Sequence, residues 1–153
     1  MKIRFLLSLA GLAVGFAFPT LAQEQNTVDP EVRQQIEAVA MKFVEAYNKH
    51  DAAALAAGYT ADAVEVRSWA TSWNGGTHSG QQAIEKMFET DFKLFPGKMV
   101  NKLVQLYPIA NEVCAIANRN VGTWKGYTVT IYVRALDPDT WKVHMTYVNE
   151  LPP

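Results

Sequence analysis

The sequence lacks most features that identify a particular chemistry. Cys114 is the only cysteine among 153 residues, so a disulfide bond within one molecule is excluded. No Gly-rich phosphate loop, nucleophile elbow or dinucleotide fingerprint occurs, and His50, His78 and His144 lack the spacing of a metal site. The sequence therefore predicts no cofactor and no metal, and a stability that comes from packing.

Clusters of basic residues are also absent. The chain has 14 basic and 15 acidic side chains, a formal net charge of −1 with neutral histidines. Binding to nucleic acid depends on grouped lysines and arginines, because these neutralise phosphates. We therefore expect no nucleic-acid partner.

One long apolar run is present, and it lies at the N-terminus. Residues 5–18 (FLLSLAGLAVGFAF) follow two basic side chains, and Thr20 and Ala22 are small residues at the −3 and −1 positions of a cleavage site. This pattern is typical of a signal peptide, and 14 apolar residues are too few for a stable membrane span. The sequence predicts a signal peptide over residues 1–22, cleavage after Ala22, and a periplasmic or secreted protein with no membrane attachment.

The remaining part, about 131 residues, is long enough for one domain. Removing Lys2 and Arg4 leaves 12 basic against 15 acidic side chains, a net charge of −3. We expect a disordered lead-in over residues 23–29 and a single domain over residues 30–150.

Hydrophobic periodicity divides this domain into helices and strands. Apolar residues recur at helical spacing over 30–49 and again up to about residue 92, with a short alanine-rich helix after Asp51. From residue 98 onward the period changes to two. The predicted strands cover 63–69, 99–108, 112–123, 127–136 and 141–149. The fold class is α+β, a curved and mostly antiparallel sheet wrapped around about three helices.

Local signals place the turns of the domain. Gly58 is expected to take a left-handed conformation at the corner before the first strand. Residues 74–76 (NGG) predict a reversal that is followed by a short strand. Ser79 and Gln82 have the spacing of a capping box, and residues 125–126 (KG) are expected to form a hairpin turn.

Three segments resemble the SnoaL-like or nuclear transport factor 2-like proteins. Residues 48–66 (NKHDAAALAAGYTADAVEV) are similar to the corner of that family, residues 80–84 (GQQAI) to its helix opening, and residues 141–143 (WKV) to its last strand. The family includes polyketide cyclases, ketosteroid isomerase and a kinase association domain. The resemblance implies a cone with a single cavity and a homodimer formed through the outer face of the sheet. These motifs indicate a fold and not a reaction.

The resemblance also permits a comparison with ketosteroid isomerase. A match without gaps places its general-base aspartate at Arg67 and its oxyanion-binding tyrosine at Phe43, and places its third functional acid loosely near Tyr132. Arginine cannot accept a proton at neutral pH, and phenylalanine has no hydrogen to donate. The sequence is therefore not that of a ketosteroid isomerase.

Strand alternation puts Glu65, Arg67 and Trp69 on one face. Two interpretations remain open for this face. In one, it is exposed and carries a weak ion pair. In the other, which follows the resemblance, it lines the cavity, and Arg67 binds a carboxylate or another anion with support from Glu65.

The last two strands present a conflict of parity. Periodicity alone turns Val143 and Met145 inward and leaves His144 in solvent, whereas the family register turns His144 and Tyr132 toward the cavity. We favour the family register. The candidate catalytic residues are then Glu65, Arg67, Tyr132 and His144. The candidate ligand-binding residues are Phe43, Tyr47, Tyr59, Glu65, Arg67, Trp69, Phe88, Tyr132 and His144.

Three functions are compatible with these patterns. The first is an exported domain that binds a small, partly apolar and anionic molecule without catalysis. The second is an enzyme of the cyclase, isomerase or dehydratase kind, with Glu65 or His144 as base and Arg67 or Tyr132 stabilising an oxyanion. The third is a dimeric protein-interaction module whose cavity is filled by its own side chains.

Overall fold

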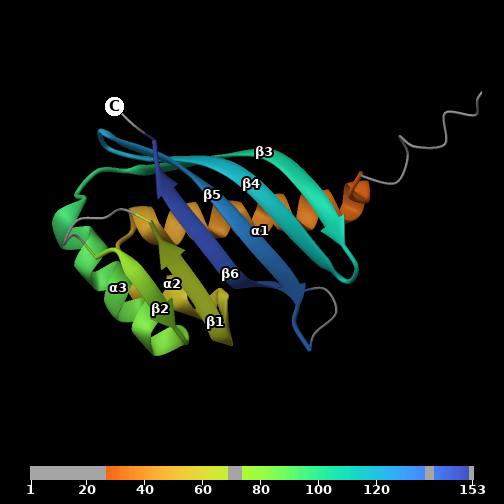
Figure 1. Ribbon diagram of the computed structural model, residues 1–153, viewed down its shortest axis with the longest axis horizontal. Coiled ribbons are helices and arrows are strands. Elements are labelled where there is room, and N and C mark those ends of the chain that lie inside the picture. Colours follow the sequence, from red (N-terminus) through yellow and green to blue (C-terminus); the bar gives the residue numbers. More distant parts are fainter. Residues whose placement is uncertain (1–26, 69–73, 137–139, 152–153) are drawn as a thin grey trace, which may run out of the picture.

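The computed structural model describes residues 27–68, 74–136 and 140–151. It contains an α+β arrangement of helices and one six-stranded sheet, as predicted (Figure 1). Within these ranges, no helix is both long and apolar enough to cross a membrane. The elements are α1 (Pro30–Asn48), α2 (Ala52–Ala57), β1 (Tyr59–Arg67), β2 (Gly76–Ser79), α3 (Gln81–Leu94), β3 (Met99–Ile109), β4 (Glu112–Val121), β5 (Trp124–Arg134) and β6 (Trp141–Glu150).

The strands follow the order β2-β1-β6-β5-β4-β3. Strand β1 runs parallel to β6, and every other neighbouring pair is antiparallel. The sheet is curved, α1 crosses one of its faces, and α3 packs beside β1 and β2 at one end (Figure 1). The side chains between the helices and the sheet form the core, where any internal site must lie.

Helix α1 begins where the sequence places it. The Asp29 side chain accepts hydrogen bonds from the backbone N–H groups of Glu31 (2.8 Å) and Val32, and Pro30 occupies the first turn. The apolar stripe of the helix buries Ile36 and Tyr47 in the core, where the Tyr47 ring contacts Phe88 and Phe92 of α3. Burial of this stripe holds α1 across the sheet and fixes the direction of Tyr47.

Two predicted local conformations are wrong. Gly58 is right-handed, with φ −74°, and the left-handed residue of this region is His50, with φ 56°. The short helix α2 therefore continues into β1 without a left-handed cap. Ser79 does not cap α3, because the cap residue is Gly80, at φ 82°, and no side chain bonds to the first turn. Instead, the Gln81 side chain donates to the Tyr59 carbonyl and ties α3 to β1.

The hairpins agree with the sequence in one place and differ in another. The reversal at residues 74–76 leads into the short strand β2, which pairs with the end of β1, as predicted. The turn between β4 and β5 lies at Gly122-Thr123, so residues 125–126 belong to β5. Trp124 and Gly126 are consequently strand residues, and they lie on the same face of β5 as the buried Thr128 and Thr130.

A β-bulge in β6 determines which residues of this strand face inward. Tyr132 pairs with Val143, whereas Ile131 pairs with Met145, so His144 is the extra residue of β6. Before the bulge Val143 is buried, as periodicity predicts, and after it Thr146 and Val148 are buried, as the family register predicts. Each interpretation is therefore correct for part of the strand.

Candidate functional site

A network of buried charged groups lies in the core between β1 and α3. Strand β1 directs Glu65 and Arg67 inward, and their relative exposures are 0% and 5%. Arg67 Nε donates to Glu65 Oε1 at 2.8 Å, and its Nη1 donates to Asp91 Oδ1 at 2.7 Å. The hydroxyl of Tyr59 donates to the second oxygen of Glu65 at 2.5 Å. The face predicted from alternation is thus interior, but its guanidinium is bound by two carboxylates of the chain itself.

Asp91 was missed by the sequence analysis. It is 4% exposed, and it also accepts a hydrogen bond of 2.9 Å from the Asn74 amide. A usable signal was present, because Asp91 follows Ile84, Met87 and Phe88 at helical spacing on the apolar stripe of α3. A carboxylate at a core position needs a cation nearby, and Arg67 is that cation.

The network shifts the pKa values of its members. Burial raises the pKa of Glu65, but the charges of Arg67 and Arg119 and the bonds from Tyr59 and Arg67 outweigh it, and the result lies below the usual value. Burial and the adjacent Glu65 charge raise the pKa of Tyr59 well above its usual value. Burial disfavours the charged form of Arg67, yet Glu65 and Asp91 raise its pKa overall. At neutral pH the Glu65–Arg67 pair is therefore ionised, and Tyr59 keeps its proton.

Arg119 is a second buried arginine, also missed by the sequence analysis, and it is bonded differently. It lies on β4 in the inward series of Ala115, Ala117 and Val121, and it is 6% exposed. Its Nε is buried without a hydrogen-bond partner, and no ion pair of its guanidinium occurs among the described residues. Its guanidinium carbon lies 4.9 Å from the centre of the Phe43 ring. In the sequence, the alternation of Ala115, Ala117 and Val121 with Arg119 indicates that this arginine is buried.

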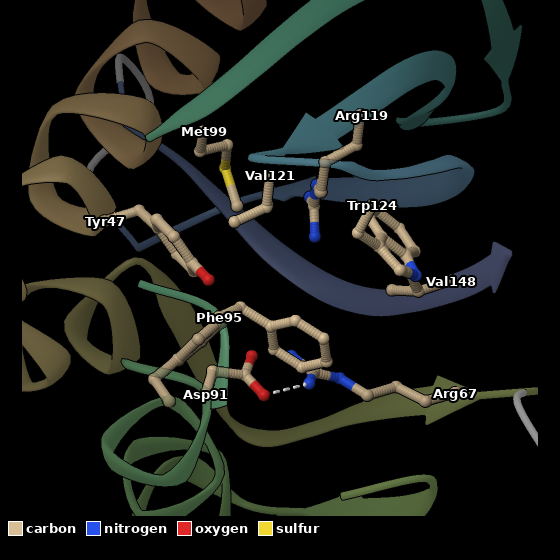
Figure 2. Close-up of a pocket in the computed structure, with 10 residues that line it drawn as sticks. Tyr47, Arg67, Asp91, Phe95, Met99, Arg119, Val121, Trp124 and Val148 are labelled. Carbon is tan, nitrogen blue, oxygen red and sulfur yellow. Dashed lines mark hydrogen bonds and ion pairs between the residues drawn. The ribbon is translucent and has the colours of Figure 1, made fainter. Parts of the chain in front are cut away.

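Arg119 faces a small cavity in the core. The cavity volume is about 30 Å³, room for roughly two water molecules. Figure 2 shows the Arg119 guanidinium and the Tyr47 hydroxyl directed toward its centre from β4 and α1. Burial and the charge of Asp91 raise the pKa of Tyr47 to about 12, so its hydroxyl stays a donor at neutral pH. The lining residues are Tyr47, Arg67, Phe88, Asp91, Phe95, Met99, Arg119, Val121, Trp124 and Val148.

Comparison with known proteins identifies the fold. No protein-family model matches the sequence, and no curated protein does. Among solved structures, a protein of unknown function with a cystatin-like fold from Nostoc punctiforme is 11% identical, with a TM-score of 0.69 over 82% of this chain and 95% of that chain. A ketosteroid isomerase-like protein from Erwinia carotovora atroseptica is 15% identical, with a TM-score of 0.63 over 82% and 100%. An NTF2-like protein of unknown function from Pseudomonas putida is 17% identical, with a TM-score of 0.62 over 80% and 89%. The fold is NTF2-like.

The NTF2-like fold brings together only some of the predicted ligand-binding residues. Tyr47, Arg67 and Phe88 line the cavity. Phe43 and Tyr59 pack against Phe88, with ring centres 5.7 and 6.2 Å from it, and they form part of the aromatic core behind the cavity. Neither they nor Glu65 belong to the cavity lining. Trp69 lies outside the described residues.

Tyr132 and His144 lie away from this cavity. Tyr132 is 5% exposed and lines a separate hollow of about 370 Å³ between α1, α2 and the start of β6. The expectation that His144 faces the cavity is wrong, because the bulge turns it outward. There its Nδ1 lies 3.1 Å from Thr60 Oγ1, with 43% of its side chain exposed. Arg67 pairs with Val148, four residues along β6 and so roughly 13 Å from position 144.

The arrangement limits the chemistry of this NTF2-like domain. Both oxygens of Glu65 are bonded, its pKa is lowered, and it does not line the cavity, so it is poorly suited to accept a proton from a ligand. No group of three or more metal-ligating side chains occurs in the part of the chain that the structure describes. What the cavity does offer is a set of hydrogen-bond donors, from Arg119 and Tyr47.

Proposed function

We propose that the protein is an exported binding domain for a small molecule that carries a carboxylate, and that Arg119 binds this group. The observation behind the proposal is the state of Arg119, which is 6% exposed, unpaired at Nε and directed into the cavity. A buried donor without a partner costs about 1–3 kcal/mol, and more for a charged group. A carboxylate is the acceptor that matches the planar guanidinium.

Charge balance within the core is compatible with this role. Glu65 and Asp91 share Arg67, so these three groups sum to −1, and Arg119 brings the cluster to neutrality. The charge of Arg119 acts on Glu65 only through space, since no hydrogen bond joins them. The donors of Arg119 therefore remain available to a ligand, while its charge is stable inside the protein.

The Tyr47 hydroxyl is a second hydrogen-bond donor directed into the cavity. Its side chain is almost fully buried, and within the described residues its hydroxyl has no hydrogen-bond partner. With a pKa of about 12, the hydroxyl is protonated at neutral pH, where a carboxylate is ionised. An arginine and a protonated tyrosine together can bind both oxygens of one carboxylate.

The third of the possible functions, a dimeric interaction module with a filled cavity, is favoured by one observation. A cavity of about 30 Å³ is much smaller than the roughly 300–1,000 Å³ of most ligand sites. In that case Arg119 would be a structural residue held by its contact with Phe43, and no carboxylate would reach it. The two functions make opposite predictions for Arg119.

Nitrogen-15 NMR of the arginine Nε–H groups tests the proposal directly. Acetate is titrated into the mature protein while the Nε–H signals of Arg119 and Arg67 are followed in the same spectrum. We expect a saturable shift of the Arg119 signal and a much smaller change for Arg67, whose Nε is bonded to Glu65. Arg119→Met assigns the signal and should abolish the saturable response.

Arg33, which forms an exposed pair with Glu37, provides the control. An Arg33→Met variant should bind acetate as the wild type does. If acetate at hundreds of millimolar leaves the Arg119 signal unmoved, or moves Arg33 and Arg119 alike, the proposed carboxylate site is wrong and the interaction module is the better interpretation.

A further inference from the structure

The inner cavity lies next to a larger hollow at the surface. This outer hollow has a volume of about 630 Å³ and shares Phe95, Val121 and Trp124 with the lining of the inner cavity. It lies between the loop that leads from α3 to β3 and the turn between β4 and β5. Its lining residues are Leu94, Phe95, Pro96, Gly97, Val121, Gly122, Thr123, Trp124 and Glu150.

The sizes of the two spaces indicate which part of a ligand each could hold, a small head group in the inner cavity and the larger body in the outer hollow. The inner cavity has room for a group the size of two water molecules, and the outer hollow is within the range of small-molecule sites. A molecule whose carboxylate is bound by Arg119 must therefore place the rest of its atoms in the outer hollow. That body would contact Phe95 and Trp124, which belong to both linings.

The register of the sheet brings Trp124 next to Arg119. Gly126 on β5 pairs with Arg119 on β4 and with Glu150 on β6, so all three positions face the same side. A Cβ at position 126 would overlap the six-membered ring of the Trp124 indole. The absence of that Cβ allows the indole to lie over Gly126, beside the arginine.

This position of the indole also separates Arg119 from Glu150. Positions 119 and 150 lie on the strands on either side of Gly126, and no ion pair joins their side chains among the described residues. The indole over Gly126 therefore lies between these two strand positions, and it presents an aromatic surface next to the guanidinium. Glu150 remains at the rim of the outer hollow as a negative charge.

Resting on the proposed carboxylate site, we infer that the ligand is an aromatic monocarboxylate whose ring packs against Trp124. An aromatic body gains about 0.5–1.5 kcal/mol from contact with another ring beyond its buried area, equivalent to roughly two- to tenfold in affinity. A second carboxylate at the far end of the ring would approach Glu150 and be disfavoured. The site therefore selects benzoate-like molecules over acetate, over saturated rings and over dicarboxylates.

Calorimetric titration of the mature protein with matched probes tests this inference. Benzoate is the reference probe. Acetate has the carboxylate without a ring, and cyclohexanecarboxylate has a saturated ring. Benzamide has the aromatic ring without the charge, and terephthalate has a second carboxylate. We expect benzoate to bind at least tenfold more tightly than acetate and about two- to tenfold more tightly than cyclohexanecarboxylate. Benzamide and terephthalate should bind more weakly than benzoate.

Substitutions at Trp124 identify the surface involved. They are made in the Glu150→Gln background, so that Glu150 cannot pair with Arg119 once the indole is removed. Trp124→Leu should lower benzoate affinity several times more than acetate affinity, and Trp124→Phe should recover most of the loss. Glu150→Gln alone should narrow the difference between benzoate and terephthalate.

The outcomes separate the two proposals. If acetate saturates Arg119 but benzoate binds no more tightly, or Trp124→Leu weakens both probes equally, the aromatic ligand is wrong and the carboxylate site stands. If benzamide binds as tightly as benzoate, the ligand is neutral and the inference is overturned. If no carboxylate shifts the Arg119 signal, both proposals fail.

Discussion

The guanidinium carbon of Arg119 lies 4.9 Å from the centre of the Phe43 ring, and this contact replaces the ion pair that a buried arginine usually forms. Arg67, in the same cluster, has two carboxylates within 2.8 Å. The two arginines thus differ in role. Arg67 joins β1 to α3, whereas Arg119 keeps its donors directed into a cavity.

Replacing the two arginines by methionine should affect stability unequally. Arg67→Met leaves Glu65 and Asp91 as uncompensated buried charges and should cost about 3–5 kcal/mol of the free energy of unfolding. Arg119→Met leaves the cluster with a net charge of −1, but it breaks no hydrogen bond or ion pair and removes a buried donor without a partner, so its cost should be smaller, about 1–2 kcal/mol. Urea unfolding measures both values. Equal losses would show that Arg119 is structural.

The pKa of Glu65 makes stability depend on acidity. Its folded-state pKa is lowered from 4.5, because the two arginines and its hydrogen bonds outweigh the effect of burial. The unfolded chain therefore binds more protons than the folded one between the lowered pKa and 4.5. The contribution of Glu65 is complete above pH 4.5 and is lost as the pH falls through the folded-state value.

We expect the free energy of unfolding of the wild type to fall more steeply below pH 4.5 than that of Glu65→Gln. The substitution removes this titration, although it also lowers stability at neutral pH by breaking the bond with Arg67. Chemical unfolding at closely spaced pH values between 3 and 7 gives both slopes. Parallel curves for the two proteins would contradict the lowered pKa.

The order of the elements could be predicted because each one carries its own periodicity. The stripe of α1 and the alternation of β3 to β6 are visible in short windows of sequence. The parity of one strand placed Glu65 and Arg67 on the same face, and the inward direction was one of the two interpretations that the sequence left open. These features depend on local patterns, which a single sequence contains.

The bonding within the site could not be predicted in the same way. Asp91 and Arg119 occupy core positions of α3 and β4, so the sequence does indicate that both charges are buried. Their bonding partners depend on how elements far apart in the sequence pack together. The direction of His144 depends on a bulge in the register between β5 and β6. No glycine or proline lies at that point of β6, so the sequence carries no local sign of it.

Two glycines provide a test of the local geometry. A Cβ on Gly97 would lie 2.5 Å from the Gly122 Cα, where two backbones meet at the rim of the outer hollow. Gly97→Ala should therefore cost about 1–3 kcal/mol. Gly58 has a right-handed φ of −74°, and Gly58→Ala should change stability by less than about 1 kcal/mol. A large loss at Gly58 in urea unfolding would favour the left-handed corner that the sequence suggested.

The apolar N-terminal segment should be removed during export. We expect protein recovered from the periplasm or medium of a bacterial host to begin at Gln23, as measured by intact mass. Ala22→Arg places a long charged side chain at the −1 position and should block cleavage, whereas Gln23→Ala should not. Recovery of the full-length chain from wild-type cells would contradict the proposed signal peptide.

The outer face of the sheet is where we expect two copies of the protein to associate. Ile131 on β5 points away from the helices, and Met145 beside it on β6 is 41% exposed. We expect the wild type to sediment as a dimer and Ile131→Lys as a monomer, because the substitution puts a charge among apolar side chains. Met41, 62% exposed on α1, is the matched control, and Met41→Lys should leave association unchanged. A wild type that sediments as a monomer over the whole concentration range would exclude this interface, and so would equal disruption by the two substitutions.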